Sequence, residues 1–328
     1  QFSKPRSDEF ENVNGEFVKV YKGDMINREN PKFRDHDPKL MIKAYQQSAE
    51  TLNLLRALSN SYFSNIDVNE WITSLNLYAI KPILDDFKQN LNILKACGLD
   101  KDRALNSASI YTGHEGLLLE YEQAFTRTDR FTGKYYDCSS HFLWIGERTR
   151  NIEEGHVEFF RGINNPIGVK LSTKIEPNEL LCLLDVLNPT NKKGKISLIV
   201  RMGKKIYNHL PQLIDAVQEH GLNVIWVCDP MHANGSVFKN KKTRFFKDII
   251  EELECFFQIH KEKGTLPGGI HLEMTGRDVT ECIGGKYNTY FTDEIYSKYE
   301  TSCDPRLNIF QTIELIEHVA PIINEFND

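Results

Sequence analysis

The chain has 328 residues, of which 40% are apolar and 26% are charged, and its formal net charge is -6. These values are typical of a globular protein, and the lack of a basic excess argues against a nucleic-acid binder. No apolar run reaches the roughly 18 residues that a membrane-spanning helix needs. The seven cysteines are scattered singly, with no CxxC pair. This pattern predicts a reduced intracellular protein, and the choice between cytoplasm and plastid stays open.

The first predicted elements are helices within residues 38–100. Two helices are predicted there, and the second runs from Pro82 to Ala96. The first is indicated by apolar side chains that recur at helical spacing: Ile42, Tyr45, Ala49, Leu52, Leu55 and Leu58.

From residue 141 onward, short apolar runs alternate with amphipathic helices, which predicts an α/β fold with a parallel sheet. Pro177 and Pro211 suit first helical turns, and Gly221 and Gly264 suit helix ends. The helices are predicted at Pro177–Leu187, Leu210–Glu219 and Phe245–Lys261. The six strand candidates are "FLWIGER" (142–148), "IGVK" (167–170), "ISLIVR" (196–201), "NVIWVCD" (223–229), "GIHLE" (269–273) and "TSCD" (301–304).

Nearly every one of these runs leads to a charged or metal-ligating side chain. A buried parallel strand has no use for a charge at its end unless that end faces a site. In a (β/α)8 barrel the carboxyl ends of the strands form the active-site face. Six such endings in succession would be hard to place in a plain core and indicate a site at the carboxyl ends of the strands, as in a barrel of this kind.

One set of candidate site residues is cationic. Arginine binds phosphate and carboxylate through two parallel hydrogen bonds, and lysine adds a compact charge. Several such groups in one cavity would suit a substrate with two or three anionic groups; the alternative is that each one pairs with a nearby carboxylate. The set is Lys4, Arg6, Arg148, Lys170 and Arg201.

A second set, His232, Glu273 and Asp304, offers one imidazole and two carboxylates. These donors suit a divalent metal such as Mn²⁺, Co²⁺ or Zn²⁺. The alternative is a core histidine beside two salt-bridged acids. His114 and His271 could line the site, but we expect them to pack in the core or just behind it. The "KNKKTR" run (239–244) is expected to be a solvated face, with a substrate phosphate as the alternative partner.

With these motifs together, the chain resembles the class II 3-deoxy-D-arabino-heptulosonate 7-phosphate (DAHP) synthases from its first residue to its last helix. The matching stretches are "QFSKPRS" (1–7), "YKGDMIN" (21–27), "SAETLNLLRA" (48–57), "HFLWIGERTR" (141–150), "NPIGVKLS" (165–172), "LNPTNKKGKISLIVRMG" (187–203), "WVCDPMHAN" (226–234), "PGGIHLEMTGRDVTECIGG" (267–285) and "CDPRLN" (303–308).

The resemblance implies a transferase that condenses phosphoenolpyruvate with erythrose 4-phosphate to DAHP and phosphate, the first step of the shikimate pathway to the aromatic amino acids. It also implies a (β/α)8 TIM barrel with extra helices, as one catalytic domain over residues 1–328 with a helical insertion at 38–100. A divalent metal, with Mn²⁺ the first choice, and a homo-oligomer are implied as well. The implied ligands of phosphoenolpyruvate are Lys4, Arg148, Lys170 and Arg201, and Glu147 places a water. Arg6 and Ser7 would hold the phosphate of erythrose 4-phosphate, and His232, Glu273 and Asp304 the metal.

The chain also departs from the family pattern. The family's cysteine metal ligand, in a Gly-Gly-Asp-Cys-Ala-Glu motif, and an arginine before "KPRS" have no counterpart here. With six strand candidates where a barrel has eight, we expect a fragment that lacks the first two strands, and expect it to be poorly soluble and inactive alone. Two other functions stay open: a catalytically incomplete relative that acts as a binding or regulatory subunit, and another metal-dependent barrel aldolase.

Overall fold

The computed structural model describes residues 3–6, 8–59, 72–73, 78–98, 110–287 and 297–326. The chain forms two compact units. The first comprises Gln1–Met41 and Gly113–Asp328, and the second comprises Ile42–Thr112. All of the strands belong to the first unit, among the residues that the structure describes.

The second unit is helical, as the sequence predicts. Its main helices are α1 (Lys39–Ser59), which begins at the end of the first unit, and α3 (Lys81–Ala96). A short 3-10 helix, Tyr78–Ile80, leads into α3, which has a proline in its first turn. Gly98, at a φ of 78°, follows the end of α3. Proline and glycine thus mark the two ends of this helix, as expected.

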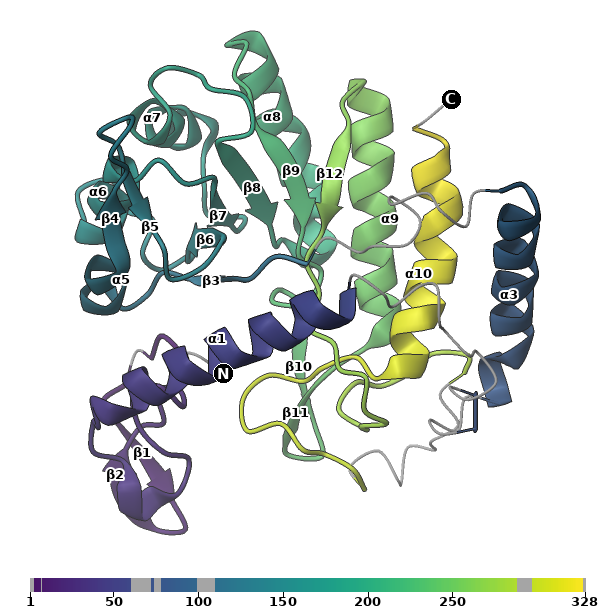
Figure 1. The fold of residues 1–328 in the computed structure, drawn as a ribbon, viewed down its shortest axis with the longest axis horizontal. Helices are drawn as coiled ribbons and strands as arrows, with labels where there is room; N and C mark the ends of the chain where they lie inside the picture. The colour runs from purple at the N-terminus through teal and green to yellow at the C-terminus, as the bar shows by residue number, and fades with distance from the viewer. Residues whose placement is uncertain are drawn as a thin grey trace. The chain divides into compact units, whose positions relative to one another are not determined.

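The first unit is built around one sheet of six parallel strands (Figure 1). Their order in the sheet, β12-β9-β8-β7-β6-β3, is also their order along the chain, read backwards. Each step between neighbours is therefore a crossover of the βαβ type. The strands are β3 (Gly113–Glu115), β6 (Phe142–Ile145), β7 (Ile167–Leu171), β8 (Ile196–Val200), β9 (Ile225–Cys228) and β12 (Pro267–Ile270).

Helices follow most of these strands in the chain. α7 begins with Pro177 in its first turn, and α9 ends at Gly264, which adopts the left-handed conformation with φ 62°. α7 packs against α8, α8 against α9, and α9 against α10. The helices are α5 (Leu119–Phe125), α6 (Gly155–Gly162), α7 (Pro177–Leu187), α8 (Ile206–Glu219), α9 (Phe246–Lys263) and α10 (Ile309–Asn324).

The core of this unit lies between the sheet and its helices. All five residues of β7 are buried, as expected for a central parallel strand covered on both faces. Leu180 and Leu183 of α7 and Leu210 of α8 belong to the same buried apolar cluster. Full burial of such a side chain contributes about 1.5–3 kcal/mol, so this packing fixes the strands whose ends carry the candidate site residues.

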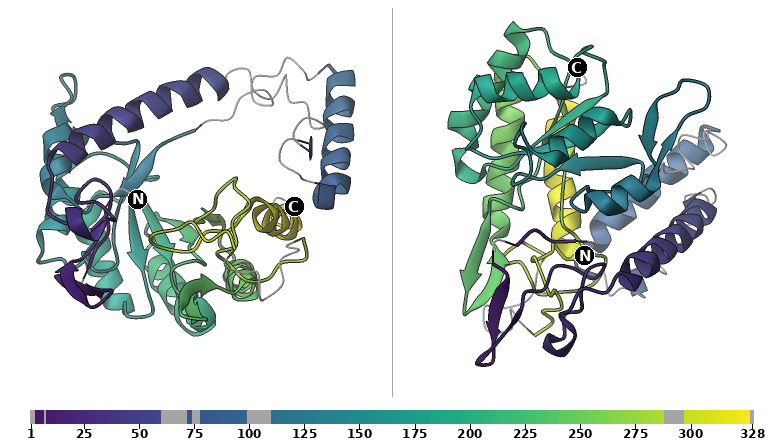
Figure 2. Two further views of the ribbon diagram at one scale, coloured as in Figure 1. Left: turned by 90° about the horizontal axis from the view of Figure 1, so that it is seen from below. Right: turned by 90° about the vertical axis from the view of Figure 1, so that its left-hand side faces the viewer.

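Three hairpins complete the first unit: β1 (Phe10–Val13) with β2 (Glu16–Lys19), β4 (Thr126–Thr128) with β5 (Tyr135–Asp137), and β10 (Gly235–Phe238) with β11 (Lys241–Arg244). The β1–β2 and β10–β11 hairpins extend past the carboxyl ends of the sheet strands (Figures 1 and 2). The "KNKKTR" run lies in the β10–β11 hairpin, whose turn residues Lys239 and Asn240 have positive φ.

Two local predictions are wrong. "TSCD" (301–304) forms bends and no strand, and the sixth strand is instead β3, whose short polar sequence Gly-His-Glu gave no apolar signal. Pro211 does not begin a helix but lies inside α8, which starts five residues earlier at Ile206. Pro211 is the sixth residue of α8, so it removes only the hydrogen bond to the carbonyl of Tyr207, in the first turn of the helix.

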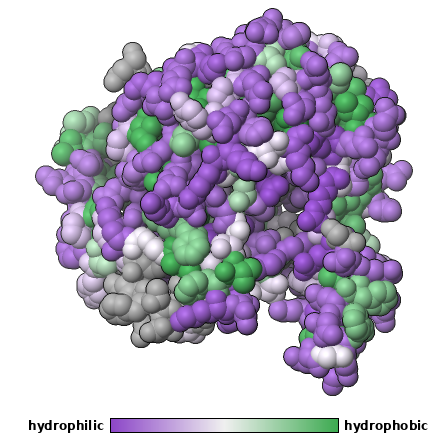
Figure 3. All heavy atoms as spheres, turned by 180° about the vertical axis from the view of Figure 1, so that it is seen from behind, coloured by the Kyte–Doolittle hydropathy of each residue, from purple (hydrophilic) through white to green (hydrophobic). Residues whose placement is uncertain are grey.

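The surface on the side opposite to Figure 1 is mostly hydrophilic, and its apolar residues form small separate groups (Figure 3). Within the described residues, none of the helices combines the length and the apolar character needed to cross a membrane.

Candidate active site

One cavity of about 1080 Å³ in the first unit is lined by residues that follow the carboxyl ends of the sheet strands and by the segment Ser3–Arg6. It brings together every predicted site residue that the structure describes. These are Lys4, Arg6, Glu147, Arg148, Lys170, Arg201, His232, Glu273 and Asp304. Ser7, predicted to hold a substrate phosphate, lies outside the described residues.

The parallel sheet explains this convergence. Lys170 is the fourth residue of β7, Arg201 directly follows β8, and His232 lies four residues beyond the end of β9. Glu147 and Arg148 come just after β6. Because neighbouring strands run in the same direction, the side chains at their carboxyl ends meet at one edge of the sheet.

The three predicted metal ligands form one cluster. One ligating atom from each of His232, Glu273 and Asp304 lies within 4.8 Å of the others. The Nε2 atom of His232 is 3.3 Å from Oε1 of Glu273. One imidazole and two carboxylates at this spacing are a donor set that a divalent cation can bind.

The imidazole of His232 is oriented by a buried carboxylate. Its Nδ1 atom lies 2.7 Å from Oδ2 of Asp229, a residue that is 0% exposed. Burial opposes a charged imidazole, but the hydrogen bonds to Asp229 and Glu273 outweigh burial and raise the pKa of His232 to about 9. A carboxylate that holds one ring nitrogen while the other faces the ligand cluster is the usual support of a metal-bound histidine. These residues fit a metal, which on binding would replace the proton that the raised pKa keeps on the imidazole.

Cations already balance the two carboxylates of the cluster. Nη1 of Arg244, a buried residue of β11, lies 2.5 Å from Oε2 of Glu273. Lys4 donates to Oδ2 of Asp304 at 3.0 Å and also contacts the thiol of Cys303. Burial would raise the pKa of Asp304, but Lys4 lowers it to about 2. Both carboxyl groups are therefore ionised at neutral pH, as metal ligands must be.

Lys170 is held at the centre of the site. Its buried ammonium group forms an ion pair with Asp229 and lies 5.8 Å from the centre of the Trp144 ring. Burial alone would raise the pKa of Asp229, but Lys170 and His232 hold it well below its usual value. The rings of His271 and Trp144 pack edge to face with 5.3 Å between their centres, and burial lowers the pKa of His271 to about 4. This histidine is neutral at pH 7.

The predicted anion-binding arginines contact the backbone of other site segments. Nη2 of Arg201 donates to the carbonyl of His232 at 2.5 Å, and Nε of Arg6 donates to the carbonyl of Tyr21 at 2.8 Å. Glu147 accepts hydrogen bonds from the amide and the hydroxyl of Ser172, at 2.8 and 2.5 Å. These contacts hold the side chains at the cavity wall, and all five of the predicted cations line the cavity.

Three site residues were not predicted. Asp229 was recognised as a strand end but given no role, and Arg244 was read as part of a solvated run. Glu115 ends β3, the strand that the sequence did not reveal, and it lines the cavity. Burial raises its pKa, although Lys170 opposes that shift. A Cβ atom at Gly146 would collide with this carboxylate, so the glycine makes room for it.

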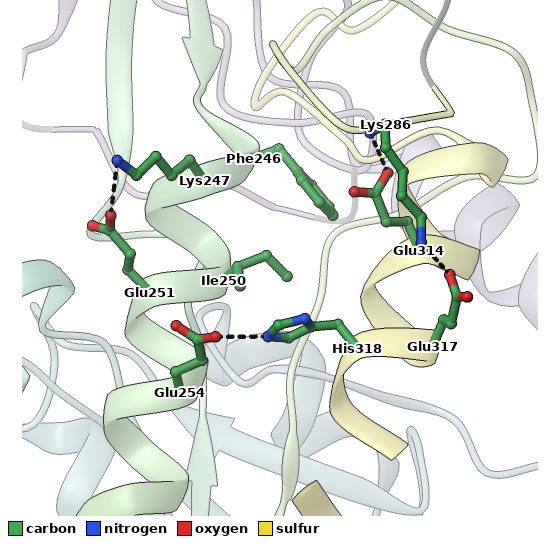
Figure 4. Close-up of a pocket in the computed structure, with 9 residues that line it drawn as sticks. All are labelled: Phe246, Lys247, Ile250, Glu251, Glu254, Lys286, Glu314, Glu317 and His318. Atoms are coloured by element: carbon green, nitrogen blue, oxygen red, sulfur yellow. Dashed lines mark hydrogen bonds and ion pairs between the residues drawn. The ribbon is translucent and has the colours of Figure 1, made fainter. Parts of the chain in front are cut away.

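A second cavity, of about 570 Å³, lies between α9 and α10 (Figure 4). Its acidic side chains already have partners among the described residues. Glu254 lies 2.8 Å from His318, Glu317 lies 2.8 Å from Lys286, and Glu251 pairs with Lys247. None of the predicted site residues lines this cavity, and the larger cavity is therefore the candidate active site.

Comparison with known proteins agrees with the resemblance. The model of the class-II DAHP synthetase family matches residues 1–320. A phospho-2-dehydro-3-deoxyheptonate aldolase of Streptomyces coelicolor is 40% identical over 335 residues, which cover 99% of this chain and 74% of the relative. A protein of the same name from Mycolicibacterium smegmatis is 41% identical over 341 residues, 99% of this chain and 72% of the relative. The chain therefore belongs to the class-II DAHP synthetase family and shares its DAHP synthase activity.

Proposed function

We propose that the 1080 Å³ cavity is where this chain condenses phosphoenolpyruvate with erythrose 4-phosphate to give DAHP and phosphate. One observation carries this proposal: the cluster of His232, Glu273 and Asp304, whose ligating atoms lie within 4.8 Å, shares one cavity with Lys170, Arg148 and Arg201. A metal site beside several cations suits a reaction between two phosphorylated substrates.

The six-stranded sheet is proposed to be part of a (β/α)8 barrel within a single catalytic domain. Its strands are parallel and follow one another in sequence order, and the cavity lies at their carboxyl ends. Active sites of such barrels are found at that end.

Lys4, Arg148, Lys170 and Arg201 are proposed to bind phosphoenolpyruvate. Arg6 and Ser7 are proposed to bind the phosphate of erythrose 4-phosphate. These cations hold both substrates so that the enol carbon of phosphoenolpyruvate faces the aldehyde of erythrose 4-phosphate. This positioning removes much of the entropic cost of bringing the two together. Fixed cations also need no reorganisation when charge develops during the reaction.

Two side chains are proposed to act on the reacting groups. Lys170, a cation held by Asp229, donates a proton to the aldehyde oxygen as the new carbon–carbon bond forms. Glu147 orients the water that adds to C2 of the former phosphoenolpyruvate, after which phosphate departs. His232, Glu273 and Asp304 would hold a divalent metal, with Mn²⁺ as first choice and Co²⁺ or Zn²⁺ as alternatives. A metal held there supplies Lewis acidity toward the aldehyde oxygen.

A phosphate-release assay tests this proposal. The sequence alone predicted a chain that is inactive by itself, but this chain already holds the metal cluster and the cations in one cavity. We therefore expect phosphate to form when the chain is supplied with Mn²⁺, phosphoenolpyruvate and erythrose 4-phosphate together, and not when erythrose 4-phosphate is omitted. Chelation with EDTA should stop the release, and added Mn²⁺ should restore it. Phosphate release that does not depend on erythrose 4-phosphate would contradict the proposed condensation.

A further inference from the structure

Glu252 is a buried acid of α9 that lies just behind the active-site cavity. It is 2% exposed, and its partners include Met202, which lines the cavity. An ionisable carboxyl group in such a place carries a large desolvation cost unless hydrogen bonds compensate for it. Burial raises the pKa of Glu252 to about 7, although the amides of Met202 and Gly203 oppose the shift.

The two oxygens of this carboxyl group connect α9 to two different active-site loops. Oε1 accepts hydrogen bonds from the amides of Met202 and Gly203, at 2.8 and 2.7 Å. Oε2 accepts from Nδ2 of Asn234 at 2.7 Å. Met202 directly follows Arg201, and Asn234 lies two residues after His232.

The two loops also contact each other directly. The Arg201 side chain donates to the carbonyl of His232 at 2.5 Å. Gly203 has a φ of +59°, and a Cβ there would lie 3.3 Å from Oδ1 of Asn234. Asn234 also donates to the carbonyl of Pro230 at 2.8 Å. The loops after β8 and β9 are thus in close contact with each other. Glu252 accepts hydrogen bonds from both loops and so binds both of them to α9.

We propose that Glu252 is a positioning residue that holds the Arg201 loop and the His232 loop in one fixed arrangement, and so couples substrate binding to metal binding. This inference rests on the proposed function, since it takes Arg201 as a ligand of phosphoenolpyruvate and His232 as a ligand of the metal. Glu252 does not itself contact the reacting atoms and acts only by holding these loops. Residues that orient metal ligands in this way affect metal affinity or activity by about 10- to 100-fold.

The variant that tests the proposal is Glu252→Gln, which keeps the size of the side chain. Its amide oxygen can still accept from the amides of Met202 and Gly203. Its amide nitrogen then faces Nδ2 of Asn234, so that two hydrogen-bond donors oppose each other and no bond forms. We expect the loop that carries His232 to shift, with Mn²⁺ affinity reduced about 10-fold in calorimetric titration without substrates. The shift should also move the Arg201 guanidinium, because it donates to the carbonyl of His232. We therefore also expect a higher KM for phosphoenolpyruvate.

Two further variants make this result specific. In the double variant Glu252→Gln with Asn234→Asp the hydrogen bond between residues 252 and 234 is restored with its direction reversed, although a carboxylate at 234 cannot donate to the carbonyl of Pro230. Mn²⁺ affinity should therefore recover in part relative to Glu252→Gln and to Asn234→Asp alone. Glu254→Gln is the matched control, because this glutamate of the same helix pairs with His318 in the second cavity (Figure 4). It should keep wild-type Mn²⁺ affinity and wild-type KM.

Thermal unfolding separates positioning from general stability. If Glu252→Gln lowers Tm but leaves Mn²⁺ affinity and the KM for phosphoenolpyruvate unchanged, Glu252 only supports the fold and the inference is overturned. The same holds if Glu252→Gln and Glu254→Gln behave alike in both measurements. A wild-type chain without turnover would overturn the proposed function itself, whereas wild-type turnover with an unaffected Glu252→Gln variant would overturn only this inference.

Discussion

The buried carboxylate of Asp229 holds the imidazole of His232, with 2.7 Å between Oδ2 and Nδ1, and the same carboxylate pairs with the ammonium group of Lys170. One acid at the end of β9 therefore orients both a proposed metal ligand and the proposed proton donor. Asp229 also accepts from the amides of Met231 and His232, at 3.0 and 3.2 Å, which fixes the carboxylate itself.

Replacing Asp229 with asparagine should damage both stability and metal binding. The change leaves the buried Lys170 without its partner, and breaking a buried ion pair in this way costs about 3–5 kcal/mol. We expect the free energy of unfolding in urea at pH 7 to fall by that amount. Asp215→Asn is the control, because Asp215 forms a partly exposed pair with Lys263, and ion pairs in contact with solvent contribute about 0–1 kcal/mol. Equal losses in the two variants would contradict the role of Asp229.

Removing either Arg148 or Lys170 should reduce turnover severely. Arg148→Ala and Lys170→Ala each remove a cation that we propose contacts phosphoenolpyruvate in the transition state, and we expect kcat/KM to fall by the equivalent of about 2–4 kcal/mol. Steady-state kinetics with both substrates measure this loss. Arg161→Ala, which removes an exposed arginine paired with Glu158 on α6, should leave kcat/KM unchanged. Near-wild-type kinetics in both site variants would exclude the proposed roles.

Removing one carboxylate of the proposed metal cluster should weaken metal binding before it affects folding. Glu273→Gln keeps the shape of the side chain but removes its charge, and we expect Mn²⁺ affinity measured by calorimetry to drop at least 10-fold. Glu158→Gln, on the exposed face of α6, is the control for the loss of a carboxylate. If Mn²⁺ bound Glu273→Gln as tightly as the wild type, the cluster would not be the metal site.

The stability of the fold should decrease in mild acid because of His260. This histidine of α9 is fully buried beside Phe256, and burial lowers its pKa to about 4. Below pH 6.5 the unfolded chain binds a proton at this position and the folded chain does not, so stability is lost as the pH falls from about 6.5 toward 4. The contribution approaches about 1.4 kcal/mol per pH unit in that window.

Urea unfolding at several pH values between 7 and 4 measures this dependence. In His260→Leu the histidine contribution disappears, and the free energy of unfolding should fall less steeply with acid than in the wild type. His220→Gln, at an exposed position after α8, controls for the loss of a histidine as such. An unchanged slope in His260→Leu would show that the buried imidazole is not the cause.

Local signals in the sequence were sufficient for much of the fold. Pro177 and Gly264 mark the ends of α7 and α9 because proline suits a first turn and glycine a left-handed end, and both effects are local. The apolar runs before Lys170 and Arg201 predicted buried strands, because burial on both faces requires near-continuous apolar sequence. β3 was missed because a three-residue strand ending on Glu115 has no such run.

The supporting contacts of the site could not be predicted in the same way. Arg244 reaches Glu273 from a hairpin, and Glu252 reaches Met202 across 50 residues of chain. Nothing near these residues in the sequence distinguishes them from other charged side chains on a helix or in a turn. Only the folded sheet, which brings the loops after β8 and β9 together, gives them their partners.

The most direct test of the account is a crystal structure of the chain with Mn²⁺ and phosphoenolpyruvate, with the metal located by its anomalous signal. We predict one strong peak about 2.0–2.3 Å from Nε2 of His232 and from carboxylate oxygens of Glu273 and Asp304. The phosphate of phosphoenolpyruvate should lie against Arg148, Lys170 and Arg201. A metal peak away from these three ligands, or phosphoenolpyruvate bound outside this cavity, would contradict the account.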